Sequence, residues 1–254
     1  MPRASDYLIE GYTYHLTHRC HNRKFLLRFA RDRDAYREWL REGIRRHRVP
    51  VYGYCLTSNH VHLVVHADRA EAVSGLMHLA AGATAKQYNL RKGHLGSLWE
   101  HPYQCTLIED GQHLLNCLCY VDLNMVRAGV VPHPREWRWC GYDELSGSRQ
   151  RYRLVNEDRL LESMGIGTPQ ELRELYIEAI ERRLAEGRLA REPLWTESLA
   201  VGSKSFTGDV SAKYTQRRTL DVEEVSDLAI KTWALKESQE AYNAFPAPKN
   251  SAKA

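Results

Sequence analysis

The sequence lacks any long uninterrupted apolar run, although 43% of its 254 residues are apolar. A membrane-spanning helix needs about 18 or more such residues in succession, and no stretch approaches that length. The N-terminus, MPRASDYLIEGY, also lacks the apolar segment of a secretory signal. We therefore expect a soluble, cytoplasmic protein with no membrane partner, long enough to bury one good core and an appendage.

Two further patterns are missing. The cysteines show no CxxC pair, so neither a zinc ribbon nor a disulfide scaffold is indicated, and buried or free thiols are expected at Cys20, Cys55, Cys105, Cys117, Cys119 and Cys140. The chain also has no phosphate-binding glycine loop, no heptad array and no internal repeat. Nothing in the sequence therefore points to chemistry driven by a nucleotide.

Lysine is scarce, with 9 residues against 27 arginines, and the formal net charge is +4. Residues 1–48 carry a net charge of +6, so the remaining residues sum to −2. Arginine binds phosphates through two parallel hydrogen bonds and stacks on flat rings. The N-terminal charge suggests a polyanionic partner, and a basic surface that serves only solubility is the alternative.

The hydrophobic periodicity of the first half predicts the order βαββαβα. Strands are expected at 12–18, 51–56, 61–66 and 103–108, and helices at 32–48, 70–89 and 112–128. The simplest architecture for this order is an α+β, ferredoxin-like, four-stranded antiparallel sheet with helices on one face.

We place a first domain at residues 1–148, a mainly helical C-terminal region at 149–243 and a disordered tail at 244–254. The segment from Thr168 to Glu171 is a capping box with proline at the first helical position, which predicts a helix up to Gly187. Asp221 and Glu224 predict another short helix.

The strongest local signal is the run Asn59-His-Val-His-Leu63 in the second strand of the expected hairpin. Side chains two apart on a strand share a face, so His60 and His62 project together. Two adjacent imidazoles can bind one metal ion, and two polar residues on a hydrated sheet face are the alternative reading.

A second signal lies on the helix expected at 112–128. Tyr120, Asn124 and Arg127 are spaced i, i+4, i+7 and form a polar face away from the apolar stripe. Taken singly, Tyr120 is explained by a hydrogen-bonded core hydroxyl and Asn124 by an amide that caps a loop.

Together the two segments predict a chemically complete site. If the third helix packs across the sheet face that bears His60 and His62, Asn124 supplies an oxygen ligand and Tyr120 points at the group the metal holds. Such a mixed set suits Mg²⁺ or Mn²⁺ better than a closed zinc site. Tyr120 is then the nucleophile toward a phosphodiester.

Four segments together resemble the single-tyrosine HUH transposases of the IS200-like family, and more narrowly the REP-associated tyrosine transposases of bacteria. They are Tyr14–Arg19, Ser58–Leu63, Tyr120–Val130 and Trp137–Tyr142, and the resemblance spans about residues 1–145. Where the family usually has proline, this chain has Met125, which should let the helix run on.

The resemblance implies that His60, His62 and Asn124 are the metal ligands and Tyr120 the catalytic nucleophile. It implies a single-stranded DNA substrate that folds into a REP-like hairpin, cut to leave a 5′-phosphotyrosine and a free 3′-hydroxyl, in the bacterial cytoplasm at the nucleoid. It favours a monomer, and related enzymes that exchange tyrosine helices leave a dimer as the alternative.

Basic residues after the first strand are the best candidates for DNA contact, namely Arg19, Arg23 and Lys24, with Arg127 beside the tyrosine. Two other functions stay open. A binding protein without turnover would use the same basic surface for DNA or structured RNA. A metal-dependent hydrolase is disfavoured because a tyrosine stands where a general base would be wanted.

Overall fold

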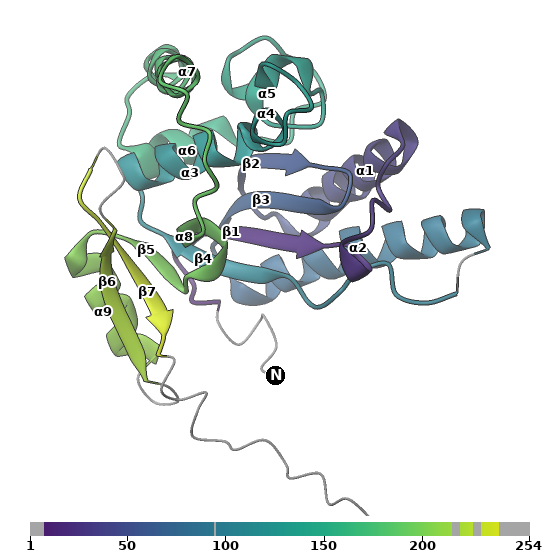
Figure 1. Cartoon of the computed structure of the whole chain (residues 1–254), viewed down its shortest axis with the longest axis horizontal. Coiled ribbons are helices and arrows are strands. Elements are labelled where there is room, and N and C mark those ends of the chain that lie inside the picture. Colours follow the sequence, from purple (N-terminus) through teal and green to yellow (C-terminus); the bar gives the residue numbers. More distant parts are fainter. Residues whose placement is uncertain (1–7, 94, 215–218, 226–229, 239–254) are drawn as a thin grey trace, which may run out of the picture.

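The computed structural model describes residues 8–93, 95–214, 219–225 and 230–238 (Figure 1). The first half has the elements β1 (Tyr12–Arg19), α1 (Ala30–His47), β2 (Val51–Leu56), β3 (His60–Ala67), α2 (Ala70–Lys92), β4 (Gln104–Ile108), α3 (Gln112–Asp122) and α4 (Asn124–Arg127). Short 3-10 helices lie at η2 (His21–Arg23) and η3 (Pro134–Glu136).

The second half has the elements α5 (Tyr142–Leu145), α6 (Glu157–Met164), α7 (Pro169–Ala185), α8 (Leu194–Glu197), β5 (Ala200–Gly202), α9 (Lys204–Tyr214), β6 (Leu220–Val225) and β7 (Thr232–Glu237). The capping box expected at Thr168 is present, since the Glu171 amide donates to the Thr168 hydroxyl at 3.2 Å. In the described part of the chain no helix is both long and apolar enough to cross a membrane. The tail predicted at 244–254 lies outside the described residues.

The sheet has seven strands within the described residues, in the order β2-β3-β1-β4-β5-β7-β6, so the prediction of a four-stranded ferredoxin-like sheet is wrong. The first four strands pair antiparallel, as predicted. Strand β5 then joins β4 in parallel, with Leu107 opposite Ala200, and β7 and β6 continue the sheet. Without β5, strand β4 would present an edge of unpaired backbone groups. The C-terminal region therefore shares a sheet with the first half.

The region predicted to be mainly helical therefore contains three strands, β5, β6 and β7. The segment from Asp221, predicted to be a short helix, lies in strand β6. Every residue of β6 pairs with β7, and the Lys236 ammonium reaches a Glu223 carboxylate oxygen at 2.7 Å. A short isolated helix is marginal in water, so strand pairing overrides the local capping signal.

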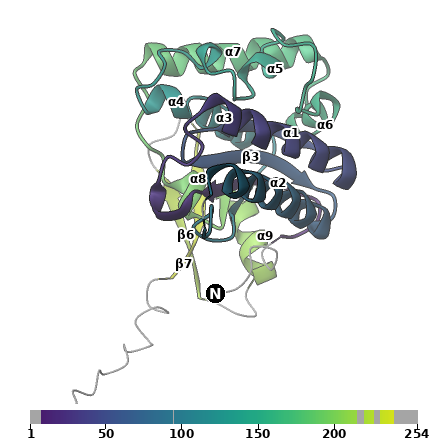
Figure 2. The ribbon, with the colours of Figure 1, turned by 90° about the vertical axis from the view of Figure 1, so that its right-hand side faces the viewer.

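Helices cover both faces of the sheet, which corrects the prediction that they cover one. Helices α1 and α2 run side by side on one face (Figure 2), where His18 of β1 stacks on Trp99, and Trp99 in turn meets Tyr36 of α1. Helix α3 packs on the opposite face, with Leu118 above Gly53 of β2.

The alternation of strand β3 separates its core residues from its histidines. Val61, Leu63 and Val65 are buried in the hydrophobic core, whereas His60 and His62 point to the opposite face, which α3 covers. The fold thus places two imidazoles under the helix that carries Tyr120.

The helix expected at 112–128 breaks at Leu123, whose ψ of 1° separates α3 from α4. Met125 in place of proline therefore does not let the helix run on. The Arg127 guanidinium donates a hydrogen bond to the Tyr120 carbonyl at 2.9 Å. A side chain thus satisfies a main-chain acceptor next to the break. As a result Asn124 starts a new helical turn above the sheet.

We expect Gly53→Ala to destabilise the protein by about 1 to 3 kcal/mol. A Cβ at this position would lie 2.6 Å from the buried Leu118 Cδ2, so the Leu118 side chain or α3 would have to shift. The matched control is Gly82→Ala in α2, where a Cβ meets nothing within 4 Å and where alanine should add about 0.5 to 1 kcal/mol. Urea denaturation measures both, and an unchanged midpoint for Gly53→Ala would refute this close packing of α3.

Candidate active site

Three histidines form a cluster on the sheet face beneath α3. His60 and His62 come from β3, with ring centroids 4.6 Å apart and rings nearly perpendicular. His15 comes from the neighbouring strand β1, and its ring stacks on that of His62 at 5.0 Å. The structure thus places His60 and His62 together, as the strand alternation predicts, and adds a third imidazole.

His62 lies in the middle of a line of hydrogen bonds. Its Nδ1 is 2.8 Å from His15 Nε2, and its Nε2 is 2.9 Å from Asn124 Nδ2. The other nitrogen of His15, Nδ1, is 2.7 Å from the main-chain oxygen of Trp195. His15 and His62 are almost completely buried, so these contacts are shielded from solvent.

Burial keeps these imidazoles neutral. It lowers the pKa of His15 to about 4 and, with the positive charges of Arg19 and Arg127, that of His60 to about 4. The pKa of His62 is lowered well below its ordinary value, chiefly by burial and then by His60. At neutral pH each ring therefore keeps one nitrogen lone pair, which is the form that binds metals.

The contribution of the buried histidines to the free energy of unfolding is expected to fall when the pH drops from 7.5 to 5.5. Burial lowers the pKa of both His15 and His18 to about 4, and in the unfolded chain a histidine titrates near 6.5. Between these values the unfolded state binds more protons, so stability is present above pH 6.5 and is lost as the pH falls. Each of the two residues should account for about 1 kcal/mol at pH 5.5.

Urea denaturation at both pH values measures this loss. His18→Gln should reduce it, because glutamine does not titrate. A loss that is as large in His18→Gln as in the wild type would contradict the buried, neutral state of this ring.

Tyr120 of α3 lies over the same cluster and is only 5% exposed. Its ring centroid is 6.2 Å from that of His62 and 6.0 Å from that of His15, in both cases edge to face. The Arg127 guanidinium lies 4.1 Å from the ring centre. Burial raises the pKa of the Tyr120 hydroxyl, and the nearby Arg127 opposes this rise.

The donor set fits a hard divalent ion held by nitrogen and oxygen. No group of three or more His, Cys, Asp or Glu side chains in the described ranges could hold a metal ion. Beside His60 and His62, the Asn124 amide is the candidate third ligand, and its Nδ2 lies 2.9 Å from His62 Nε2. The Nδ1 of His60 is 2.7 Å from the Asn59 side-chain oxygen, which leaves Nε2 with its lone pair.

Residues 9–123 match the family model described as "Transposase IS200 like". Over these residues the chain is similar to the IS200-like transposases. The matched segment contains His60 and His62 of β3 and also Tyr120, and it ends one residue before Asn124. No curated protein matches the chain.

Two solved structures are similar to this chain. One is a REP-associated tyrosine transposase bound to a REP hairpin, with a TM-score of 0.45 and 17% identity over 57% of this chain and 84% of that one. The other is a putative transposase from Deinococcus radiodurans R1, with a TM-score of 0.32 and 17% identity over 48% of this chain and 88% of that one.

The basic residues predicted to contact DNA take two different positions. Arg19 is exposed at the end of β1, opposite His60 in the strand pairing. Arg23 and Lys24 are exposed just beyond it, and the Asn59 amide donates to the Arg23 carbonyl at 3.3 Å, which holds this turn beside the histidines. Arg127 instead contacts Tyr120, with its guanidinium over the tyrosine ring and hydrogen-bonded to the Tyr120 carbonyl.

Two groups at this site are missing from the prediction. His15 could have been found from the alternation along β1, because residue 15 faces the same way as residues 17 and 19, which pair with His62 and His60. Trp195 gives no such signal. It is fully buried, its ring centroid is 6.2 Å from that of Tyr120, and only the tertiary fold brings it there.

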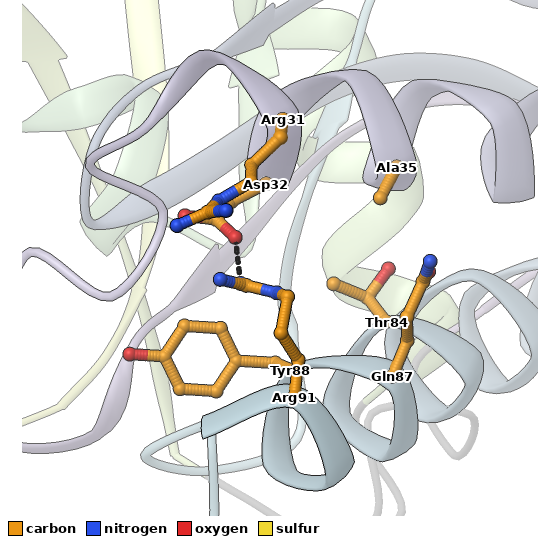
Figure 3. Close-up of a pocket in the computed structure, with 7 residues that line it drawn as sticks. All are labelled: Arg31, Asp32, Ala35, Thr84, Gln87, Tyr88 and Arg91. Atoms are coloured by element: carbon orange, nitrogen blue, oxygen red, sulfur yellow. Dashed lines mark hydrogen bonds and ion pairs between the residues drawn. The ribbon is translucent and has the colours of Figure 1, made fainter.

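A separate pocket of about 100 Å³ lies between α1 and α2, on the other side of the sheet. Figure 3 shows its lining, in which Arg91 of α2 forms an ion pair with Asp32 of α1. The remaining lining residues are Arg31, Ala35, Thr84, Gln87 and Tyr88. None of the predicted site residues lines it, so the histidine cluster remains the candidate active site.

Proposed function

We propose that this chain is an IS200-like transposase, a metal-dependent enzyme that nicks and rejoins single-stranded DNA through a 5′-phosphotyrosine, as a REP-associated tyrosine transposase does. The supporting observation is the position of the Tyr120 ring 6.2 Å from the ring of His62, which also contacts Asn124. A nucleophile and a nitrogen and oxygen donor set thus share one sheet face.

His60, His62 and Asn124 would hold Mg²⁺ or Mn²⁺. When bound, such an ion neutralises charge on the phosphate and aligns it. The protein residues supply the remainder of the chemistry. Because burial keeps the rings of His60 and His62 neutral, their nitrogen lone pairs can bind an ion instead of a proton. The fold also holds the Tyr120 ring beside that of His62.

In the proposed reaction the Tyr120 oxygen attacks the phosphorus atom of one phosphodiester. The bond between phosphorus and the 3′ oxygen breaks, the phenol proton is released, and the departing oxygen takes up a proton to become a 3′-hydroxyl. The positive charge of Arg127 opposes the rise of the Tyr120 pKa and so favours the attacking phenolate. Attack by another 3′-hydroxyl reverses these steps and rejoins strands. The diester bond energy is conserved, so no nucleotide is required.

The substrate we propose is a REP-like hairpin with an unpaired strand at its base. Exposed Arg19, Arg23 and Lys24 lie at the end of β1, beside His60, where they would contact backbone phosphates. Such a substrate places the enzyme in the bacterial cytoplasm, at the nucleoid.

We propose that the chain acts as a monomer. Tyr120 lies over the histidines of its own chain, so one copy holds both the nucleophile and the metal ligands. A dimer with exchanged tyrosine helices is the alternative, and mixing Tyr120→Phe with His62→Gln chains would restore activity only in that case.

A covalent-adduct assay tests the proposed function. The full-length protein is incubated with a hairpin oligonucleotide labelled at either end, with Mg²⁺, Mn²⁺ or chelator, and run on denaturing gels. We expect a protein adduct only with the label on the 3′ side of the cut and only with metal. Cleavage without an adduct would indicate a hydrolase, and binding of several hairpins without cleavage would indicate a binding protein.

A further inference from the structure

A buried line of hydrogen bonds connects the C-terminal region to the proposed metal ligand His62. It runs from the Trp195 carbonyl through His15 to His62, with lengths of 2.7 and 2.8 Å. All three residues are almost completely buried. Solvent therefore does not compete for these contacts.

The chemistry of the end group sets the direction of every hydrogen bond in the line. A carbonyl oxygen only accepts, so His15 Nδ1 must carry the proton and His15 Nε2 must hold a lone pair. His62 Nδ1 must then donate to His15 Nε2. This leaves the lone pair of His62 on Nε2, which faces the Asn124 amide at 2.9 Å.

We infer that His15 and the Trp195 carbonyl are positioning groups that hold His62 in one tautomer and one orientation. A free imidazole exchanges its proton between both nitrogens and prefers Nε2–H, which would block the nitrogen that faces Asn124. The line of hydrogen bonds from Trp195 through His15 excludes this Nε2–H tautomer of His62. Its value for metal binding rests on the proposed function, whereas the tautomer itself is a property of the metal-free chain.

The backbone that carries the Trp195 carbonyl is fixed at several points. Ser198 accepts a hydrogen bond at its carbonyl from the Thr106 hydroxyl at 2.7 Å, and the Leu107 amide donates to the Leu199 carbonyl at 2.8 Å. Strand β5 then pairs with β4. The short helix α8 is thereby tied to the strand beside β1, which explains how a distant segment can orient a histidine of β1.

Two substitutions of His15 separate orientation from simple packing. His15→Asn keeps a donor near Nδ1 for the Trp195 carbonyl but provides no acceptor for His62. His15→Gln places an amide oxygen near the position of Nε2, where it can accept from His62 Nδ1. His18→Asn is the control, because His18 is another buried histidine of β1 whose Nε2 contacts the His101 carbonyl on the opposite face.

The tautomers are read from ¹⁵N shifts of the histidine rings in the metal-free full chain, and Mn²⁺ affinity is measured by titration calorimetry. We expect His62 in the Nδ1–H form in the wild type and a mixture of tautomers in His15→Asn. Mn²⁺ affinity should fall about 10- to 100-fold in that variant. His15→Gln should recover most of it, and His18→Asn should match the wild type.

An Nε2–H form of His62 in the wild type, or an unchanged tautomer in His15→Asn, would overturn the inference. Both results are independent of catalysis. The proposed function fails instead if the wild type forms no DNA adduct, even where the tautomer is as inferred, so the two failures are distinguishable.

Discussion

Replacing Tyr120 with phenylalanine is expected to lower DNA cleavage by at least about a thousandfold, because the variant lacks the attacking oxygen. The hydroxyl is the only group removed, and the ring contacts with His62, Trp195 and Arg127 can persist. Hairpin binding should therefore stay within about twofold of the wild type. Single-turnover cleavage and fluorescence anisotropy with the same hairpin measure the two effects.

Tyr103→Phe is the matched control for this substitution. Tyr103 is partly buried, and its hydroxyl pairs with Ser74 of α2 rather than with the cluster. Cleavage should be unchanged in this variant. An adduct that survives Tyr120→Phe would show that another residue is the nucleophile.

His62→Gln should have the second largest effect, lowering both Mn²⁺ affinity and cleavage by at least about a hundredfold. His62 lies between His15 and Asn124 and contacts both, so its loss removes one proposed ligand and leaves the other without its partner. Calorimetry measures the affinity, and cleavage over a range of Mn²⁺ concentrations shows whether excess metal restores the rate.

His66→Gln is the control on the same strand and face. His66 Nδ1 contacts the Thr13 hydroxyl at 3.3 Å, four residues beyond His62 and outside the cluster. Metal affinity and cleavage should match the wild type. Unchanged Mn²⁺ affinity in His62→Gln would contradict a metal site at these histidines.

The central part of the fold and the juxtaposition of His60, His62, Tyr120 and Asn124 could be predicted because they follow from local patterns. Alternation along a strand fixes which side chains share a face, and helical spacing fixes the polar face of the third helix. Only one tertiary assumption was required, that this helix crosses the histidine face, and the contact between Asn124 and His62 satisfies it.

The remainder depends on contacts between distant parts of the chain. Strand β5 has three residues, Ala200–Gly202, too few for a periodic signal, and it forms by pairing with β4 and β7. Strand β6 forms on β7 in spite of a local helix signal. The break at Leu123 and the position of Trp195 likewise follow from packing that no single segment encodes.

The distance in sequence between His15 and Trp195 has a consequence for domain organisation. A first domain ending near residue 148 is a prediction from composition, but the cluster uses a carbonyl from residue 195. We therefore expect the C-terminal region to be required for an ordered site.

Peptide mapping of the covalent DNA adduct tests the central proposal most directly. The wild-type protein is reacted with the hairpin and Mn²⁺, digested with nuclease and protease, and analysed by mass spectrometry. We predict a single modified peptide that carries a 5′-linked nucleotide on the Tyr120 oxygen. A nucleotide linked to any other residue, or cleavage with no modified peptide, would contradict the assignment of Tyr120 as the nucleophile.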